Sequence, residues 1–191
     1  MRIPAAIGTL AVIGAAGAAA FFFGGFYSVA GTVKDPDIVH WALVQVRTAS
    51  IKRHADDEPP ATFNEPAKIQ AGAHAFAAIG CVNCHGAPGV KWAKFSEGLH
   101  PDPPDLKDLV DDRTPSQLFW VIKNGINMTG MPSFALAGAK DEDLWSIVAF
   151  LKKLPKISDA DYNAWTAPSA ASVPVPGSSA PGANTPLTED K

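Results

Sequence analysis

The amino-terminal segment of the chain is an apolar stretch long enough to cross a membrane. Residues 3–33 contain no Asp, Glu, Lys, Arg or His, and a helix needs about 20 apolar residues to span a bilayer core. We therefore predict a transmembrane anchor over residues 1–33, with Arg2 on the cytoplasmic side under the positive-inside rule. The alternative is a cleaved signal peptide, because "SVAG" at residues 28–31 suits a signal peptidase, although signal peptides have apolar cores of only about 7–15 residues. Both interpretations export everything after Lys34.

Residues 34–62 are predicted to form an amphipathic helix followed by a linker. Asp37 is a candidate N-cap, and Ile38, Trp41 and Ile51 lie partly on one side of the helix that follows. Basic residues gather toward the far end of this helix: Arg47, Lys52, Arg53 and His54. Such a helix could lie on a lipid surface or against a partner subunit, and a plain linker helix is the other interpretation. The prolines and carboxylates of "DDEPPATFNEP" then indicate a linker.

Residues 63–157 have the pattern of a compact helical domain. One predicted helix follows Asn64, a candidate cap, and has a proline in its first turn. A second, "DEDLWSIVAFLKKLP", begins with carboxylates and ends in two lysines before a proline, which suits the helix dipole. Gly72 and Phe76 share a face of the first helix, as Ile147 and Phe150 do on the second, so the two helices could cross closely.

The carboxyl-terminal segment, residues 158–191, is rich in Pro, Ser, Ala and Gly. Apart from a short helix near Tyr162 and Trp165, it has too little apolar surface to order itself. We therefore predict a largely disordered tail.

Charge and composition argue against several functional classes. The chain has a formal net charge of −3, with no glycine-rich phosphate loop and no basic run interleaved with aromatic residues. Nucleic acid is therefore not an expected partner. Its two cysteines are too few for a disulfide framework.

Both cysteines lie in one short motif, "CVNCH" at residues 81–85. Positions i, i+3 and i+4 of a helix share a face, so Cys81, Cys84 and His85 would point the same way. They could bind zinc, cycle as a redox dithiol or attach a haem covalently. Zinc usually takes two pairs of ligands, and no second Cys/His pair exists; a thioredoxin-like dithiol is expected in a βαβ context. C-x-x-C-H is the attachment signature of c-type haem, with one thiol for each vinyl group and His85 as an axial ligand.

A second axial ligand is expected from "GINMTGMPSF" at residues 125–134. Apart from Met1, this loop holds the only methionines of the chain, Met128 and Met131. Methionine often fills gaps in cores, but these two lie between glycines and prolines with no helical period. We favour Met131 because Pro132 restricts the backbone beside it, and Met128 is the alternative.

Together these residues resemble the class I c-type cytochromes over residues 66–154. The resemblance rests on the two motifs above, on the two crossing helices and on "PPDL" at residues 103–106. It implies an all-α fold, with a small cytochrome c-like helical domain around one covalently attached haem c, preceded by a single transmembrane helix. It also implies that the Pro104 carbonyl accepts a hydrogen bond from His85 Nδ1, and that Trp120 and Phe119 line the haem or touch a propionate.

The resemblance implies an electron carrier rather than an enzyme. With His85 and Met131 on the two axial sites, no position is open to a small-molecule substrate, and Met/His ligation raises the reduction potential. We expect single electrons to pass between respiratory-chain partners on the periplasmic side of a bacterial inner membrane. Candidate partners are a quinol-oxidising complex, a dehydrogenase or a terminal oxidase. The alternatives are a fixed haem c subunit of a larger membrane dehydrogenase or oxidase, and a gas-binding haem protein, which the methionine loop argues against.

Overall fold

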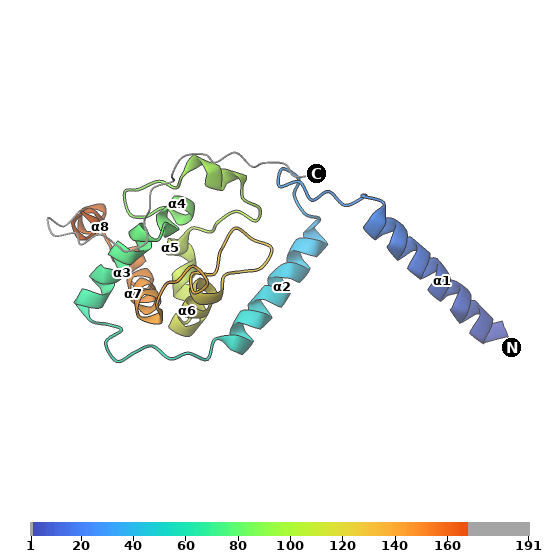
Figure 1. Cartoon of the computed structure of the whole chain (residues 1–191), viewed down its shortest axis with the longest axis horizontal. Coiled ribbons are helices and arrows are strands. Elements are labelled where there is room, and N and C mark those ends of the chain that lie inside the picture. Colours follow the sequence, from blue (N-terminus) through green and yellow to red (C-terminus); the bar gives the residue numbers. More distant parts are fainter. Residues whose placement is uncertain (1, 168–191) are drawn as a thin grey trace, which may run out of the picture.

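The structure, a computed structural model, describes residues 2–167, with side chains from residue 6 onward, and its regular elements in that range are all helices (Figure 1). The α-helices are α1 (Arg2–Phe23), α2 (Asp37–His54), α3 (Pro66–Ala78), α4 (Cys81–His85), α5 (Leu106–Leu109), α6 (Pro115–Asn124), α7 (Asp141–Leu151) and α8 (Asp159–Thr166). Short 3₁₀ helices lie between them: η1 (Lys94–Gly98), η2 (Val110–Asp112) and η3 (Leu154–Lys156). The predicted all-α fold is confirmed.

α1 is the apolar helix expected at the amino terminus. Its segment Ala6–Phe23 has a mean hydropathy of 2.0, and none of it is buried. By length and composition it is the one helix of residues 2–167 that could cross a membrane, and a signal sequence would meet the same description. Figure 1 shows α1 standing apart from the other helices, at the end of an extended connection.

The core of the domain is the crossing of α3 and α7. Gly72 of α3 is buried against the α7 backbone: a Cβ built on it would lie 1.9 Å from the Ser146 carbonyl oxygen and 2.9 Å from the Cβ of Phe150. Four residues along α3, the ring of Phe76 meets that of Phe150, with centroids 5.4 Å apart. The close crossing expected from the sequence is therefore present, because glycine lacks the side chain that would separate the two backbones.

α6 packs beside α7 and begins with a complete capping box. The Thr114 hydroxyl accepts a hydrogen bond from the Gln117 amide, and the Gln117 side-chain oxygen accepts one from the Thr114 amide, both at 3.2 Å. Phe119 is fully buried and stacks on Trp145 of α7, with ring centroids 4.1 Å apart. These contacts fix the helix that leads into the methionine loop.

α2 lies along α6 (Figure 1), an arrangement that the sequence does not indicate. Ile51 is buried, at 8% exposed. One turn later, His54 stacks on Trp120 of α6 with ring centroids 6.1 Å apart. One side of α2 is thus part of the packed domain. Ile38 and Trp41, which the sequence pattern places partly on one side with Ile51, are exposed, so that expectation is wrong.

The two helix caps expected from the sequence are wrong. Pro36 occupies the N-cap position of α2, and Asp37 lies in the first turn, where its charge favours the helix dipole without a cap hydrogen bond. Glu65, not Asn64, occupies the N-cap position of α3, and its side chain makes no cap hydrogen bond. Asn64 lies instead within a turn closed by a 3.0 Å hydrogen bond from the Glu65 amide to the Thr62 carbonyl.

α8 extends the packing of the domain into residues 158–191, the segment that the composition assigns to a tail. The Ser158 hydroxyl caps the helix. Tyr162 is 2% exposed, and its ring centroid lies 5.8 Å from that of Phe150. The short helix expected here therefore adds its tyrosine to the core of α3 and α7. Residues 168–191, the rest of the predicted tail, lie outside the described residues.

Candidate functional site

α4 is a five-residue helix that carries Cys81, Cys84 and His85, and a glycine lies at each end of it. Gly80 has φ of 90° and Gly86 has φ of 65°, in the left-handed region that glycine adopts without strain. These two turns separate α4 from α3 before it and from the loop after it. The spacing of three and four residues places both thiols and the imidazole on one side of the helix.

The chain after α4 folds back against it. The amide of Ala93 donates to the Asn83 carbonyl at 2.8 Å, and Ala87 and Val90 exchange two hydrogen bonds of 2.9 Å. A Cβ built on Gly86 would lie 3.0 Å from the Val90 carbonyl oxygen, so this return needs glycine. The position of α4 is therefore fixed by backbone contacts.

Burial keeps the Cys81 thiol protonated. Cys81 is 8% exposed, and burial raises the pKa of its thiol to about 12. Disulfide exchange requires a thiolate at neutral pH, so this thiol is not activated for that chemistry. Within residues 2–167, no three His, Cys, Asp or Glu side chains gather as a metal site would require.

His85 is held as a neutral imidazole with one nitrogen directed at Pro104. Burial lowers the pKa of His85 from its ordinary value, and the hydrogen bond to the Pro104 carbonyl opposes this shift in part. Nδ1 donates to that carbonyl at 3.0 Å, as the sequence resemblance implies. With its proton on Nδ1, the ring presents the lone pair of Nε2, which is the arrangement of a histidine ligand with an outer hydrogen-bond partner.

The methionine loop fixes the backbone of Met131 from both sides. The Met131 amide donates to the Thr129 hydroxyl at 3.1 Å, and the Met131 carbonyl accepts from the Ile126 amide at 3.1 Å. The Thr129 hydroxyl in turn donates to the Ile126 carbonyl at 2.8 Å. Gly125, with φ of 71°, allows the close return of the loop, because a Cβ there would lie 2.6 Å from the carbonyl carbon of Pro132.

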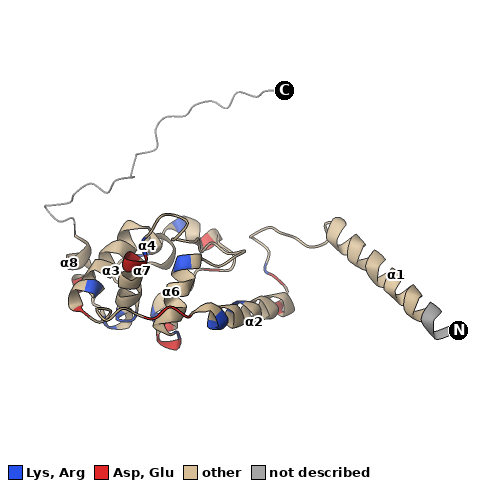
Figure 2. Ribbon diagram, turned by 60° about the horizontal axis from the view of Figure 1, so that its bottom comes forward, with Lys and Arg blue, Asp and Glu red and all other residues tan. Residues whose placement is uncertain are grey.

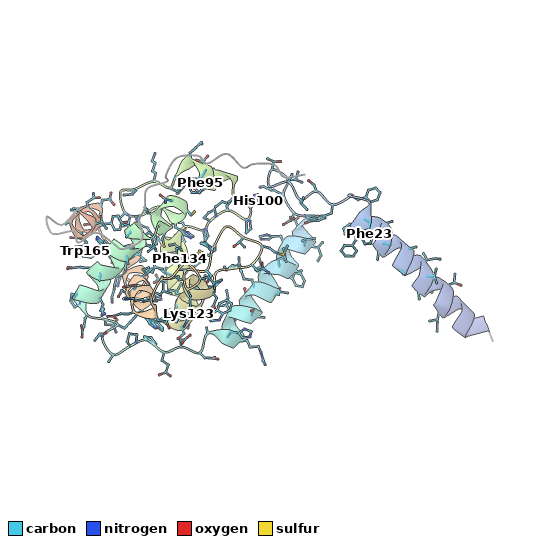
Figure 3. The ribbon with its side chains drawn as sticks, in the orientation of Figure 1. Phe23, Phe95, His100, Lys123, Phe134 and Trp165 are labelled. Atoms are coloured by element: carbon cyan, nitrogen blue, oxygen red, sulfur yellow. The ribbon has the colours of Figure 1, made fainter. Side chains whose placement is uncertain are left out.

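The two methionines of this loop have different surroundings. Met131 is half-buried and packs against the hydrophobic core, as does Phe134, which is also half-buried and is labelled in Figure 3. Met128 is 79% exposed and has a φ of 60°. Of the two thioethers, the loop therefore turns that of Met131 toward the domain and that of Met128 toward solvent.

Phe119 and Trp120, which the resemblance places near a haem, lie on different sides of α6. Phe119 is buried between α6 and α7, where it stacks on Trp145. Trp120 is half-buried and faces α2 through its stacking on His54. His54 thus contacts the domain, although its sequence position indicates only the end of a linker helix.

The chain was compared with known protein families, and part of it matches one of them. A family model described as "Cytochrome C oxidase, cbb3-type, subunit III" matches residues 67–151, which run from α3 to the end of α7. These residues form a c-type cytochrome domain. No curated protein and no solved structure matches the chain.

A cytochrome c domain carries covalently bound haem c, and the residues of α4 fit that group. Cys81 and Cys84 are the only thiols of the chain, so two thioether bonds would use both. The lone pair on His85 Nε2 is oriented by Pro104 and suits iron.

Two features of the cytochrome c domain are missed by sequence reasoning. The Thr129 hydroxyl links Ile126 to Met131, but a lone threonine in a loop gives no signal of such a role. Gly125 could have been recognised, because a glycine directly after a helix often adopts a left-handed conformation.

Proposed function

We propose that the protein is a membrane-anchored monohaem cytochrome c that carries single electrons through a haem ligated by His85 and Met131. That the cytochrome c domain serves electron transfer follows from its family. To this role we add three proposals: the two axial ligands, the membrane anchor and the side of the membrane.

The observation that carries the proposal is the contrast between Met131 and Met128. The Met131 backbone is held by hydrogen bonds on both sides and its side chain packs against the core, whereas Met128 is exposed. A ligand must be available at a fixed position without reorganisation, and Met131 meets this condition. With His85 on the other axial site, no site remains for a substrate or a gas.

Each of the other site residues has a positioning role in this proposal. Cys81 and Cys84 attach the haem to α4, and the Pro104 carbonyl keeps the His85 proton on Nδ1. Trp120 lies between α6 and α2, where it stacks on His54. It is the proposed aromatic neighbour of the haem. The bound haem supplies one-electron iron chemistry, and thioether ligation favours the ferrous state.

The proposed location is the periplasmic side of a bacterial inner membrane, with α1 as the anchor. α1 has the length and composition of a spanning helix, and Arg2 lies at its amino-terminal end. Redox proteins of the same membrane are the proposed partners: a quinol-oxidising complex, a dehydrogenase or a terminal oxidase. An anchor restricts the search for such partners to two dimensions.

Absorption spectra of the purified holoprotein test the proposed ligation. We expect low-spin spectra in both oxidation states, a weak long-wavelength sulfur-to-iron band in the ferric form, and no change when carbon monoxide is added to the ferrous form. Ready binding of carbon monoxide would mean that the sixth position is open, and a gas-binding or catalytic haem would replace the carrier.

A fixed subunit of a larger membrane oxidase is the second candidate function. The description of the matching family, a subunit of a cytochrome c oxidase, favours it. Purification in mild detergent separates the two: a carrier elutes alone, and a fixed subunit elutes with stoichiometric partners.

Replacing Thr129 with valine is expected to loosen the Met131 ligand without removing it. The substitution deletes the hydroxyl that bonds both Met131 and Ile126. Two hydrogen bonds of about 1 kcal/mol each would raise the population with Met131 detached by about tenfold to thirtyfold. The rate of carbon monoxide binding to the ferrous form measures that population.

Thr129→Ser is the matched control for this prediction, because it keeps the hydroxyl and removes only a methyl group. It should bind carbon monoxide as slowly as the wild type. Equal rates for the valine and serine variants would show that the hydroxyl does not hold the ligand.

A further inference from the structure

α2 has a second apolar side that the domain leaves uncovered. Ile51 and His54 face α6, whereas Ile38, Trp41 and Val46 are 69%, 59% and 67% exposed. We define the outer face of α2 by the exposed apolar residues that helical spacing places opposite Ile51, with Trp41 at the edge of this face: Ile38, Trp41, Ala42, Val46 and Ala49. Exposed and uncharged Gln45 also lies on it. A face with three large apolar side chains in water is unfavourable unless something covers it.

The outer face continues a run of exposed apolar residues that begins in α1. Among the described residues, exposed large apolar side chains extend from Ile7 to Val46 and do not occur again until Val90. The side chain of Phe23, at the end of α1, is labelled in Figure 3 and is 90% exposed. Exposed apolar residues thus extend from the proposed anchor to the middle of α2, with an interruption at the charged residues Lys34, Asp35 and Asp37.

The connection between α1 and α2 keeps α2 close to the membrane. Only residues 24–36 separate the end of α1 from the start of α2. Fully extended, these 13 residues reach about 45 Å, and they include exposed Phe26 and Val29, which would shorten the connection by entering the lipid interface. If α1 spans the membrane, the outer face of α2 therefore lies within reach of the same bilayer.

The charges of α2 suit a surface with anionic headgroups. Between Ile38 and Val46 the helix has no Lys, Arg, Asp or Glu. Lys52 and Arg53 are exposed in its last turn, and Figure 2 shows this end of α2 in blue on an otherwise largely tan helix. Basic side chains are attracted to anionic headgroups, and tryptophan is enriched at the headgroup level.

We propose that the outer face of α2 lies on the surface of the membrane that α1 spans, with Trp41 among the lipid headgroups and Lys52 and Arg53 against anionic phosphates. This inference rests on the membrane anchor of the proposed function. Because the opposite side of α2 packs on α6, the membrane surface then sets the orientation of the whole cytochrome c domain. The haem is presented to partners at a fixed height above the bilayer, rather than swinging on a free tether.

Depth measurements on the full-length holoprotein in vesicles test this placement. Ala42→Cys and Ala49→Cys carry a nitroxide on the outer face, and Leu136→Cys carries it on a side chain of the domain that is 92% exposed. The vesicles contain phosphatidylcholine and phosphatidylglycerol. We expect the nitroxides at positions 42 and 49 to collide with oxygen more than with a water-soluble nickel chelate, and the nitroxide at position 136 to show the reverse.

The possible failures of this test are distinguishable. If the protein sediments with the vesicles but positions 42 and 49 are as open to nickel as position 136, the anchor stands and the membrane placement of α2 is wrong. Strong coupling between nitroxides at position 42 would assign the face to a second copy of the chain and also overturn the proposal. If the protein stays in the aqueous phase, the anchor and the proposal fail together, while the absorption spectrum still tests the haem ligation separately.

Discussion

Replacing Gly72 with alanine is expected to destabilise the cytochrome c domain by about 3 kcal/mol or more, the upper end of overpacking effects. The added methyl group would lie 1.9 Å from the carbonyl oxygen of Ser146. That oxygen belongs to the α7 backbone and cannot rotate away, so α3 and α7 must move apart. Against a total stability of about 5–15 kcal/mol for a typical domain, this loss is large. Urea unfolding of the holoprotein, followed by far-ultraviolet circular dichroism, measures it.

Gly98→Ala is the matched control for the Gly72 prediction. A Cβ built on Gly98 meets nothing within 4 Å, and its φ lies outside the left-handed region. This substitution should change stability by less than about 0.5 kcal/mol. If both alanine variants unfold at the same urea concentration, the close crossing of α3 and α7 is not what stabilises the domain.

The parts of the fold that could be predicted are those encoded by local spacing. Cys81, Cys84 and His85 are adjacent in sequence, so one short helix brings them together without help from the rest of the chain. Gly72 and Phe76 lie four residues apart and follow the helical period, so the sequence predicts that they share one face of α3. The hydrogen bond from His85 to Pro104 spans 19 residues, and only the family resemblance indicated it.

The parts that could not be predicted depend on contacts between distant segments. The apolar residues of α2 occur on both of its sides, so the sequence pattern could not tell which side faces α6. Tyr162 lies in a segment of low apolar content, but one well-placed ring reaches Phe150 and makes α8 part of the domain. The caps predicted at Asp37 and Asn64 are wrong for a different reason. The N-cap residues are Pro36 and Glu65, each one residue away from the predicted cap.

The choice between two methionines also depends on tertiary structure. Met128 and Met131 are three residues apart in one loop, and proline geometry was the only sequence argument for Met131. The structure adds an independent difference, because Met128 is 79% exposed while hydrogen bonds to Thr129 and from Ile126 hold Met131.

Replacing Met131 with alanine is expected to open the sixth axial position of the haem. The variant should lose the sulfur-to-iron band of the ferric form and should bind carbon monoxide in the ferrous form. Its reduction potential should fall by about 0.2 V, because thioether ligation favours ferrous iron and axial ligands control a range of roughly 0.8 V. Spectroscopic redox titration of the wild type and the variant measures the shift.

Met128→Ala is the control for the Met131 prediction, since it removes the other thioether of the same loop. Its side chain is exposed, so the variant should keep the wild-type band, potential and resistance to carbon monoxide. If instead Met128→Ala loses the band and Met131→Ala keeps it, Met128 is the ligand. The loop must then rearrange on haem binding, because the Met128 side chain is exposed in the structure. If both variants keep the band, neither methionine is required alone, and the ligation that we propose is wrong although the family and its covalent haem stand.

An unfolded Met131→Ala protein would be recognised by its circular dichroism. Met131→His, which supplies another axial ligand, would then separate loss of ligation from loss of folding.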